Sequence, residues 1–422
     1  MKKYLIFLPF ILSFFFHLEA GAEEWNLKIC LDMGLKHNPA LRAATKGIEG
    51  AEARIKQSQA AYYPYLFAET DYSHGESTSS KKTTYNVGSS DLTSYYVGLS
   101  QNIYDFGRRE YKVQAAKEDL KAYQWTGRDT RLSVLDAIRQ SYYGVLLAER
   151  VVKVRREDLQ RTQEHLKQAQ GFYQVGLKAK IDVTQAEVAV ITAQKALLQA
   201  ENNIQTAWVT LTAAMGIDFP RGITLKDDLD LQPVNWDLES LQKEALEKDP
   251  VLNRYRTLVS YWEIGEKQAQ REFWPTLNGT ARYAINDGTN YSNDESWNVG
   301  LQLNIPLFSG FLKKNKLAEI RAVLDQAKAN LEMQRLSVIN NLQNQYLNYR
   351  LAEKQIEVAK ESLRRAKENL ELAEGRYKAG VGNMLDVTDA RSSFFQAETD
   401  YDQAVYSFIT SRYKVERALG RE

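Results

Sequence analysis

The stretch from Phe308 to Leu419 restricts the folds open to this chain of 422 residues more than any other. Between Gly310 and Lys378 it contains no proline and a single glycine, Gly375. Apolar or small residues recur there in alternating steps of three and four, which is the spacing of a coiled-coil seam. These positions are Ile356, Ala359, Leu363, Ala366, Leu370, Ala373 and Tyr377. The stretch therefore predicts a helix of about 100 Å, a reversal at Gly380 and Gly382, and a second long helix.

The same plan occurs twice in the chain. The segment "YQVGLKAKIDVTQA" (Tyr173–Ala186) aligns with "YKAGVGNMLDVTDA" (Tyr377–Ala390) at an offset of 204 residues. Other matched pairs are Gly216 with Gly420 at the same offset, and Pro39 with Pro250 at 211. Self-similarity of this kind indicates a tandem duplication, so each half is expected to supply the same parts.

The N-terminus has the pattern of a secretory signal peptide. Lys2 and Lys3 precede an apolar run, and Ala20-Gly21-Ala22 supplies small residues for cleavage. Residues 1–22 are therefore expected to be removed and the protein to be exported. An uncleaved anchor is the alternative, although the apolar run is short for a spanning helix. Cys30, the only cysteine, is expected to be a small apolar residue on the first helix rather than a site of lipid attachment.

The duplication sets the expected domains. The first repeat covers residues 23–216, with an opening helix, a strand pair within 66–104 and a long helical hairpin over 107–216. Residues 217–236 form the linker. The second repeat, 237–422, has an opening helix, a strand pair within 277–305 and a helical hairpin over 308–419. Polar loops are expected over 75–93 and 286–296. The fold class is mainly α, with four strands per chain.

The predicted strands alternate in polarity. In the last one, Trp297, Val299 and Leu301 share a face that Asn298 and Gly300 do not. A soluble sheet with one wet face would show this pattern, and so would strands of a membrane barrel. Export, the isolation of the pairs between long helices, and Trp and Tyr near the strand ends favour the membrane. Lipid tolerates no open sheet edge, so four strands do not suffice. Three copies would close a barrel of twelve strands, and we therefore expect a homotrimer.

Other classes of function find little support. The formal net charge is +1, which argues against a nucleic-acid binder. The four histidines are far apart, and the sequence has no metal-ligand spacing, nucleophile elbow or phosphate loop. We therefore expect no enzyme activity, no cofactor and no metal site.

Taken in order, these features resemble the TolC family of outer-membrane efflux proteins. The resemblance runs from about Leu27 to Leu419 and includes "NIYDFG" (Asn102–Gly107), "NIPLFSG" (Asn304–Gly310) and the two "DVT" tips. It implies a trimeric channel-tunnel with a twelve-stranded β-barrel in the bacterial outer membrane and an α-helical tunnel in the periplasm. It also implies docking with a periplasmic adaptor (membrane fusion) protein and an inner-membrane pump, for multidrug efflux or type I secretion.

The resemblance further implies a ring of carboxylates at the periplasmic entrance. The matching residues are Asp386 and Asp389, which would favour cations and raise one another's pKa values. Asp386 and Asp182 are also placed to cap the helices that follow them, and the two roles can coexist. Asp389 lies inside the predicted first turn, which favours it for the ring.

Links between the tips are implied as well. Asp182 is expected to accept a hydrogen bond from Tyr377 and so to hold the closed entrance. Where the best-known family members have a linking arginine and a threonine, this chain has Gly382 and Ile181, which predicts a more easily opened entrance. The expected adaptor-docking surface consists of Val175, Gly176, Leu177, Ala379, Gly380 and Val381. Ordinary turn-forming glycines are the alternative for Gly176 and Gly380.

A second reading is an exported structural coiled-coil protein, an adaptor or stalk whose strands form a soluble cap. It shares the long helices and lacks the membrane barrel. Within the channel reading, the residues do not distinguish drugs, metal ions and proteins as cargo.

Overall fold

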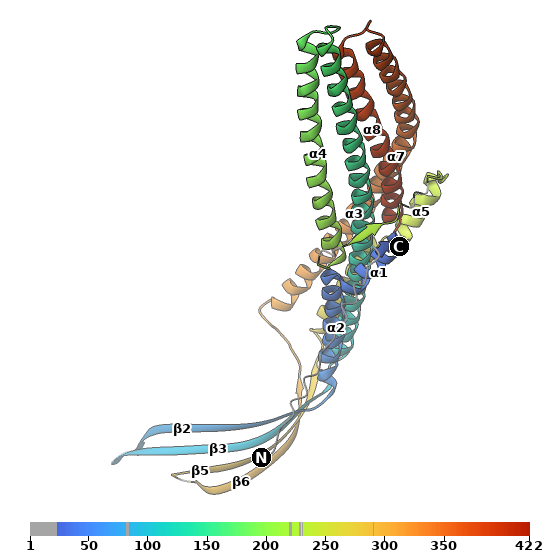
Figure 1. The fold of residues 1–422 in the computed structure, drawn as a ribbon. Coiled ribbons are helices and arrows are strands. Elements are labelled where there is room, and N and C mark those ends of the chain that lie inside the picture. The colour runs from blue at the N-terminus through green and yellow to red at the C-terminus, as the bar shows by residue number, and fades with distance from the viewer. Residues whose placement is uncertain (1–22, 82–83, 219–221, 228, 230, 290) are drawn as a thin grey trace, which may run out of the picture. The chain divides into compact units, whose positions relative to one another are not determined.

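The computed structural model describes residues 23–81, 84–218, 222–227, 229, 231–289 and 291–422 (Figure 1). The predicted signal peptide, residues 1–22, lies outside them. The described residues form two compact units. The first unit comprises the residues up to Lys36, with 138–231 and 362–406, and the second comprises 37–137, 232–361 and 407–422. Each unit draws on both halves of the sequence.

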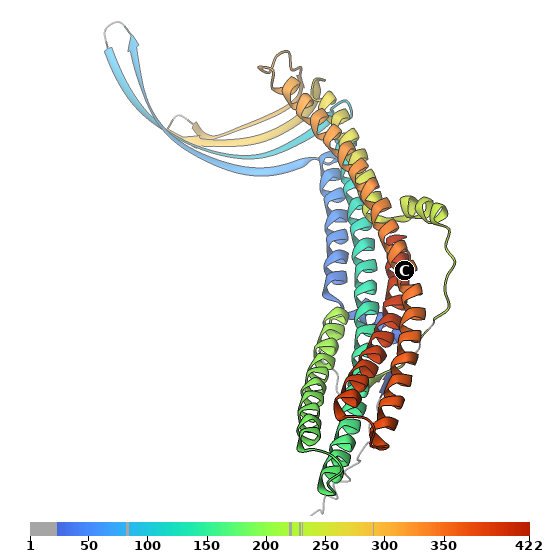
Figure 2. The same ribbon diagram turned by 90° about the horizontal axis from the view of Figure 1, so that it is seen from above.

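Four long helices dominate the first unit and lie side by side in two views (Figures 1 and 2). They are α3 (Arg108–Gln174), α4 (Lys180–Met215), α7 (Leu312–Lys378) and α8 (Met384–Ala418), of which α3, α7 and α8 have residues in both units. All seven predicted seam positions of α7 are buried or half-buried, which confirms the coiled-coil spacing. Five of the packed side chains are Val154, Leu370, Ala390, Phe394 and Phe395.

The sequence predicts a seam along α3 at Leu135, Ile138, Tyr142, Val145, Leu159, Thr162, Leu166 and Tyr173, and seven of these eight positions are buried or half-buried. Tyr142 and Val145 are 1% and 0% exposed, as expected. Tyr173, another predicted seam position, is 47% exposed, so this prediction was wrong. Toward the end of α3 the buried positions are Thr162, which was predicted, and His165 and Ala169, which were not. The buried face of α3 thus includes His165, a polar residue that the apolar pattern did not indicate.

The predicted linker contains a strand that the sequence analysis missed. In the first unit, β4 (Ile223–Leu225) pairs in parallel with β1 (Glu23–Trp25). The Tyr142 hydroxyl donates a 2.5 Å hydrogen bond to the Lys226 carbonyl oxygen just after β4. Helix α1 (Leu27–His37) follows β1.

Cys30 on α1 is fully buried, in agreement with its predicted role as a small core residue. Burial raises the pKa of its thiol to about 12. Because the thiolate is the reactive species, we expect no alkylation of native protein by a maleimide at pH 7.5 and complete alkylation in denaturant. Mass spectrometry of the intact protein measures both. Rapid labelling of the folded protein would contradict the burial of this helix face.

In the second unit, proline marks the start of two helices. The Asn38 side chain accepts a 2.8 Å hydrogen bond from the Ala40 amide at the start of α2 (Pro39–Gln59). After α5 (Leu238–Lys248), the Asp249 carboxylate accepts a 2.7 Å hydrogen bond from the Leu252 amide at the start of α6 (Pro250–Arg271). A short helix, η1 (Ala60–Tyr62), follows α2. The two helix starts, at Asn38-Pro39 and Asp249-Pro250, match N-cap chemistry with proline at the first helical position.

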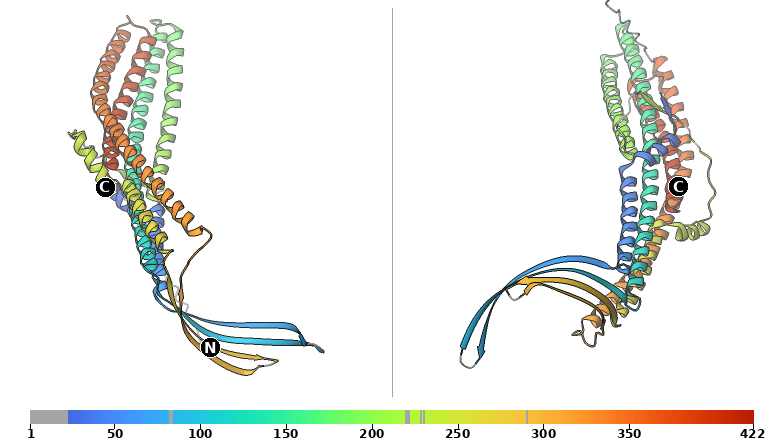
Figure 3. Two further views of the ribbon diagram at one scale, coloured as in Figure 1. Left: turned by 180° about the vertical axis from the view of Figure 1, so that it is seen from behind. Right: turned by 90° about the horizontal axis from the view of Figure 1, so that it is seen from below.

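The second unit also holds an antiparallel sheet in the order β2-β3-β5-β6 (Figure 3). Its strands are β2 (Tyr65–Lys81), β3 (Thr84–Tyr104), β5 (Thr276–Gly288) and β6 (Tyr291–Asn304). Residues that face one another across the ladders form apolar rows, as in Leu66, Leu99, Ala281 and Val299. Trp297, Val299 and Leu301 on the same face are 78%, 74% and 72% exposed. The alternation read from the sequence is therefore confirmed.

The two loops predicted between the strands were wrong. The β2–β3 ladder continues from Gly75 paired with Ser90 out to Lys81 paired with Thr84, and the hairpin extends beyond β5 and β6 (Figure 3). Likewise, β5 runs to Gly288, which pairs with Tyr291. The Ser/Thr-rich composition suggested a loop, but Thr is a good strand former, and the backbone of this segment is paired along the whole β2–β3 ladder.

Candidate functional site at the paired helical tips

The two helical hairpins of the first unit end in loops of the same conformation, at the same end of the unit (Figure 1). Gly176 and Gly380 have φ angles of +74° and +80°. Each glycine amide bonds the carbonyl oxygen three residues earlier, and the next amide bonds the one five residues earlier. This is the Schellman motif that ends helices at a left-handed glycine. The two matched glycines therefore have one structural role, and that role follows from the left-handed backbone.

Beneath the loops, all four helices share a small apolar core. Tyr377 is 1% exposed, and its ring centroid lies 5.8 Å from that of Phe172. The other buried members of this core are Ala169, Ala186, Met384 and Val387. Because every helix contributes a side chain, the two tips are packed as one body.

Asp386 and Asp389 are both exposed and lie one turn apart on α8. Neither caps the helix. The Asn383 side chain accepts a 2.8 Å hydrogen bond from the Asp386 amide, so Asn383 is the N-cap. Asp386 is then the third residue of the helix, where a carboxylate interacts favourably with the helix dipole. The capping role considered for Asp386 is wrong, and both carboxylates are free to face solvent.

Asp182 and Tyr377 are buried in the tip core. Asp182 is 8% exposed and lies in the first turn of α4, whose N-cap, Ala179, offers no side-chain bond, so the capping role for Asp182 is also wrong. Burial and, to a lesser degree, the Asp182 charge raise the pKa of Tyr377. Within the described chain the Tyr377 hydroxyl has no hydrogen-bond partner. The link between the two thus stays a prediction.

The expected docking residues lie on the loops themselves. Val175, Leu177 and Val381 are 68%, 69% and 72% exposed, which makes each loop an apolar end with a glycine at its turn. Ala379 and Gly380 are exposed beside Val381, as Gly176 is between the first two.

Lys178 joins the two loops and was not predicted. Its Nζ donates a 2.6 Å hydrogen bond to the Gly382 carbonyl oxygen and lies 5.1 Å from the centroid of the Tyr377 ring. The contact was missed because a lysine in a loop is usually solvent-exposed. In addition, no local pattern in the sequence indicates an acceptor 204 residues away.

A buried charged layer lies along the bundle from the tip core. The Arg391 guanidinium on α8 bonds the Asp158 carboxylate and the Thr162 hydroxyl on α3. Arg391, Asp158 and Thr162 are 6%, 7% and 1% exposed. This ion pair therefore connects the first hairpin to the second through the interior of the bundle.

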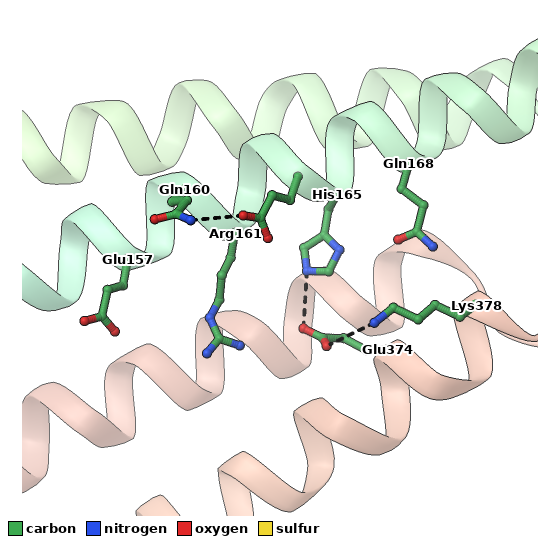
Figure 4. Close-up of a pocket in the computed structure, with 8 residues that line it drawn as sticks. Glu157, Gln160, Arg161, His165, Gln168, Glu374 and Lys378 are labelled. Carbon is green, nitrogen blue, oxygen red and sulfur yellow. Dashed lines mark hydrogen bonds and ion pairs between the residues drawn. The ribbon is translucent and has the colours of Figure 1, made fainter.

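A second polar contact joins α3 to α7. The His165 Nε2 lies 3.3 Å from a Glu374 carboxylate oxygen, and the other oxygen lies 4.0 Å from the Lys378 Nζ (Figure 4). Burial lowers the pKa of His165 more than Glu374 raises it, and Arg391 lowers it further. The lowered pKa favours the neutral imidazole. Both residues line a groove of about 480 Å³ along with Glu157, Gln160, Arg161, Glu164, Gln168 and Lys378.

An apolar groove of about 450 Å³ lies between α4 and α8. Exposed Ile181 and Val188 line it from α4, and Leu385 and Asp389 line it from α8. Asp389 therefore stands at the edge of an apolar surface. Asp386 does not line this groove.

Among the helices described, none combines the length and the apolar character needed to cross a membrane. No cluster of three or more His, Cys, Asp or Glu side chains suited to a metal ion occurs in the described part of the chain.

Comparison with known proteins identifies the family. The sequence profile described as "Outer membrane efflux protein" matches residues 30–217 and 241–421, that is, both halves. The chain is 26% identical to the outer membrane protein TolC of Escherichia coli over 443 aligned residues, covering 100% of this chain and 87% of TolC. It is 24% identical to the cobalt-zinc-cadmium resistance protein CzcC of Cupriavidus metallidurans, covering 95% of this chain and 91% of CzcC.

The fold comparison agrees. The crystal structure of the Campylobacter jejuni CmeC outer membrane channel superposes with a TM-score of 0.82 at 19% identity, covering 93% of this chain and 85% of CmeC. Long helical hairpins and four antiparallel strands, arranged as two repeats, are thus features that this chain shares with solved channels. The chain therefore belongs to the outer membrane efflux protein family and is a TolC-type efflux channel protein of the bacterial outer membrane, not an enzyme.

Proposed function

We propose that three copies of this chain form the channel, each giving four strands to one closed twelve-stranded barrel. The observation that carries the proposal is the sheet. Its outer strands, β2 and β6, each have one partner in the described sheet, and its apolar face is exposed at Trp297, Val299 and Leu301. Each unpaired backbone group in lipid costs on the order of several kcal/mol. Neighbouring copies would pair with the outer strands β2 and β6, and the apolar face of the sheet would then lie against lipid.

The helices support the same assembly. In the first unit, α4 exposes apolar side chains on one stripe, namely Ile181, Val188, Ile191 and Leu198, which are 58–67% exposed. Steps of seven and three relate them, the spacing of a coiled-coil face. In the second unit, α7 exposes Leu336, Leu347, Leu351 and Val358, which are separated by eleven, four and seven residues in that order. Neighbouring copies would cover these stripes, and a ring of hairpins would enclose a tunnel.

In this assembly, the tips would form the periplasmic entrance. Asp386 and Asp389 from each chain would supply six carboxylates to one constriction and favour cations. Asp182 and Tyr377 would act as gate links beneath it. Val175, Gly176, Leu177, Ala379, Gly380 and Val381 would contact a periplasmic adaptor, whose helical hairpins suit a surface of small and apolar residues. The two repeats, 23–216 and 237–422, would each supply one hairpin tip.

The channel would work as the passive exit of a tripartite efflux or type I secretion system, with an adaptor and an inner-membrane pump. The pump, not the tunnel, would choose the cargo. One relative's name refers to cobalt, zinc and cadmium resistance, and no described residue of this chain selects between metal ions, drugs and proteins.

Fractionation of cells that express the full chain tests this proposal. The expected product is an outer-membrane band that migrates slowly in detergent gels, collapses on boiling and conducts ions in planar bilayers. A protein found in the detergent-free periplasmic fraction, with no conductance, would instead support the exported coiled-coil stalk.

A further inference from the structure

The Lys178 side chain on the first tip loop donates hydrogen bonds to the second tip loop. Its Nζ lies 2.6 Å from the Gly382 carbonyl oxygen and 3.4 Å from the Gly380 carbonyl oxygen. We propose that this contact, the Lys178 clasp, restrains the separation of the two loops and positions them as one surface. Its role at a channel entrance rests on the proposed function.

The chemistry of the acceptors favours a cation at this point. The acceptors, the Gly380 and Gly382 carbonyl groups, lie in the loop just past the last residue of α7, Lys378, and the C-terminal end of a helix carries partial negative charge. Lys178 brings a positive charge from the first hairpin to the end of α7 on the second. The ammonium also lies 5.1 Å from the Tyr377 ring centroid, within the range of a cation–π contact. The side chain is half-buried, so solvent screens these interactions less than on an open surface.

Gly382 is suited to be the acceptor. A Cβ placed there would lie 3.0 Å from the Tyr377 amide nitrogen and 3.1 Å from the Arg376 carbonyl carbon. The loop thus folds back onto the end of α7 so closely that a side chain at this position would need a small shift of the backbone. The Gly382 amide donates a 3.0 Å hydrogen bond to the Arg376 carbonyl oxygen, which fixes the peptide plane between Val381 and Gly382.

The Lys178 contact involves Gly382, a residue that was expected to make the entrance easier to open. The resemblance to the family implies a linking arginine on the second tip where this chain has Gly382. Lys178 supplies a cation from the first tip to the same place. The Lys178 clasp therefore provides, within one chain, a contact between the two tips in place of the arginine link.

The test compares three variants of the full chain in detergent. Lys178→Met keeps the stem over Tyr377 and removes the donors, whereas Lys178→Arg keeps a cation. Lys180→Met is the matched control, because Lys180 is exposed and its ammonium makes no hydrogen bond or ion pair among the described residues. Hydrogen–deuterium exchange is followed at the Val381 and Gly382 amides, which both bond the Arg376 carbonyl oxygen.

We expect exchange at these amides to be about tenfold faster in Lys178→Met, the effect of losing a charge-assisted hydrogen bond. Lys178→Arg should restore most of the protection, and Lys180→Met should match the wild type. In planar bilayers the open fraction should rise in Lys178→Met alone. Wild-type exchange in Lys178→Met would overturn the clasp. A wild-type protein that does not conduct would contradict the channel function, and the exchange result would still decide whether the clasp holds the loops.

Discussion

Replacement of Arg391 by methionine is expected to weaken the packing of α8 on α3 by about 3–5 kcal/mol. The side chains of Arg391 and Asp158 are 7% and 10% exposed, so the variant leaves a carboxylate buried without its counter-charge. Thr162 loses a hydrogen bond at the same time. Hydrogen exchange of the α3 amides around these residues measures the change, and a loss of this size accelerates exchange by about a hundredfold or more.

Two controls separate the ion pair from a general loss of packing. Removing both charges in Asp158→Leu/Arg391→Met should recover most of the protection, because a buried pair can be replaced by apolar side chains with little loss. Lys367→Met, at an exposed basic residue of α7, should have little effect. Wild-type exchange in Arg391→Met would show that the pair does not hold the two hairpins together.

The double variant Asp386→Asn/Asp389→Asn is expected to abolish most of the cation preference of the reconstituted channel. In a trimer the two exposed carboxylates of each chain become six, and their combined field attracts cations and repels anions at the entrance. The reversal potential across a salt gradient measures the preference, which should move most of the way toward that of a non-selective pore.

The matched control for this variant is Glu319→Gln/Glu357→Gln, which removes the same charge from exposed positions of α7. Its reversal potential should stay near the wild-type value. A double aspartate variant as selective as the wild type would remove the carboxylate ring from the account and leave the channel function standing.

Backbone features were predicted best, because their causes are local. Four helix ends required a left-handed glycine, at Gly176, Gly216, Gly380 and Gly420, and the repeat offset had already paired them. Asn38-Pro39 and Asp249-Pro250 carry their own caps. The seam of α7 was complete because its members are apolar or small.

The site was predicted less well, because its contacts are long-range and polar. Asp158 and His165 are buried on α3, and a pattern of apolar residues does not indicate them, although it did indicate Thr162. Their partners Glu374 and Arg391 are more than 200 residues away in sequence. The Lys178 contact depends on the conformation of two loops, and the spacing of residues in the sequence does not predict that conformation. Asn383 was missed as the N-cap because Asp386, three residues later, is an equally good capping residue type.

The mass of the folded protein tests the central claim most directly. That claim is that one chain has too little sheet to close a barrel and that three chains complete it. Native mass spectrometry of the detergent-solubilised protein should give three subunits per particle, with no folded monomer. A monodisperse, folded monomer that is stable in buffer without detergent would contradict the account.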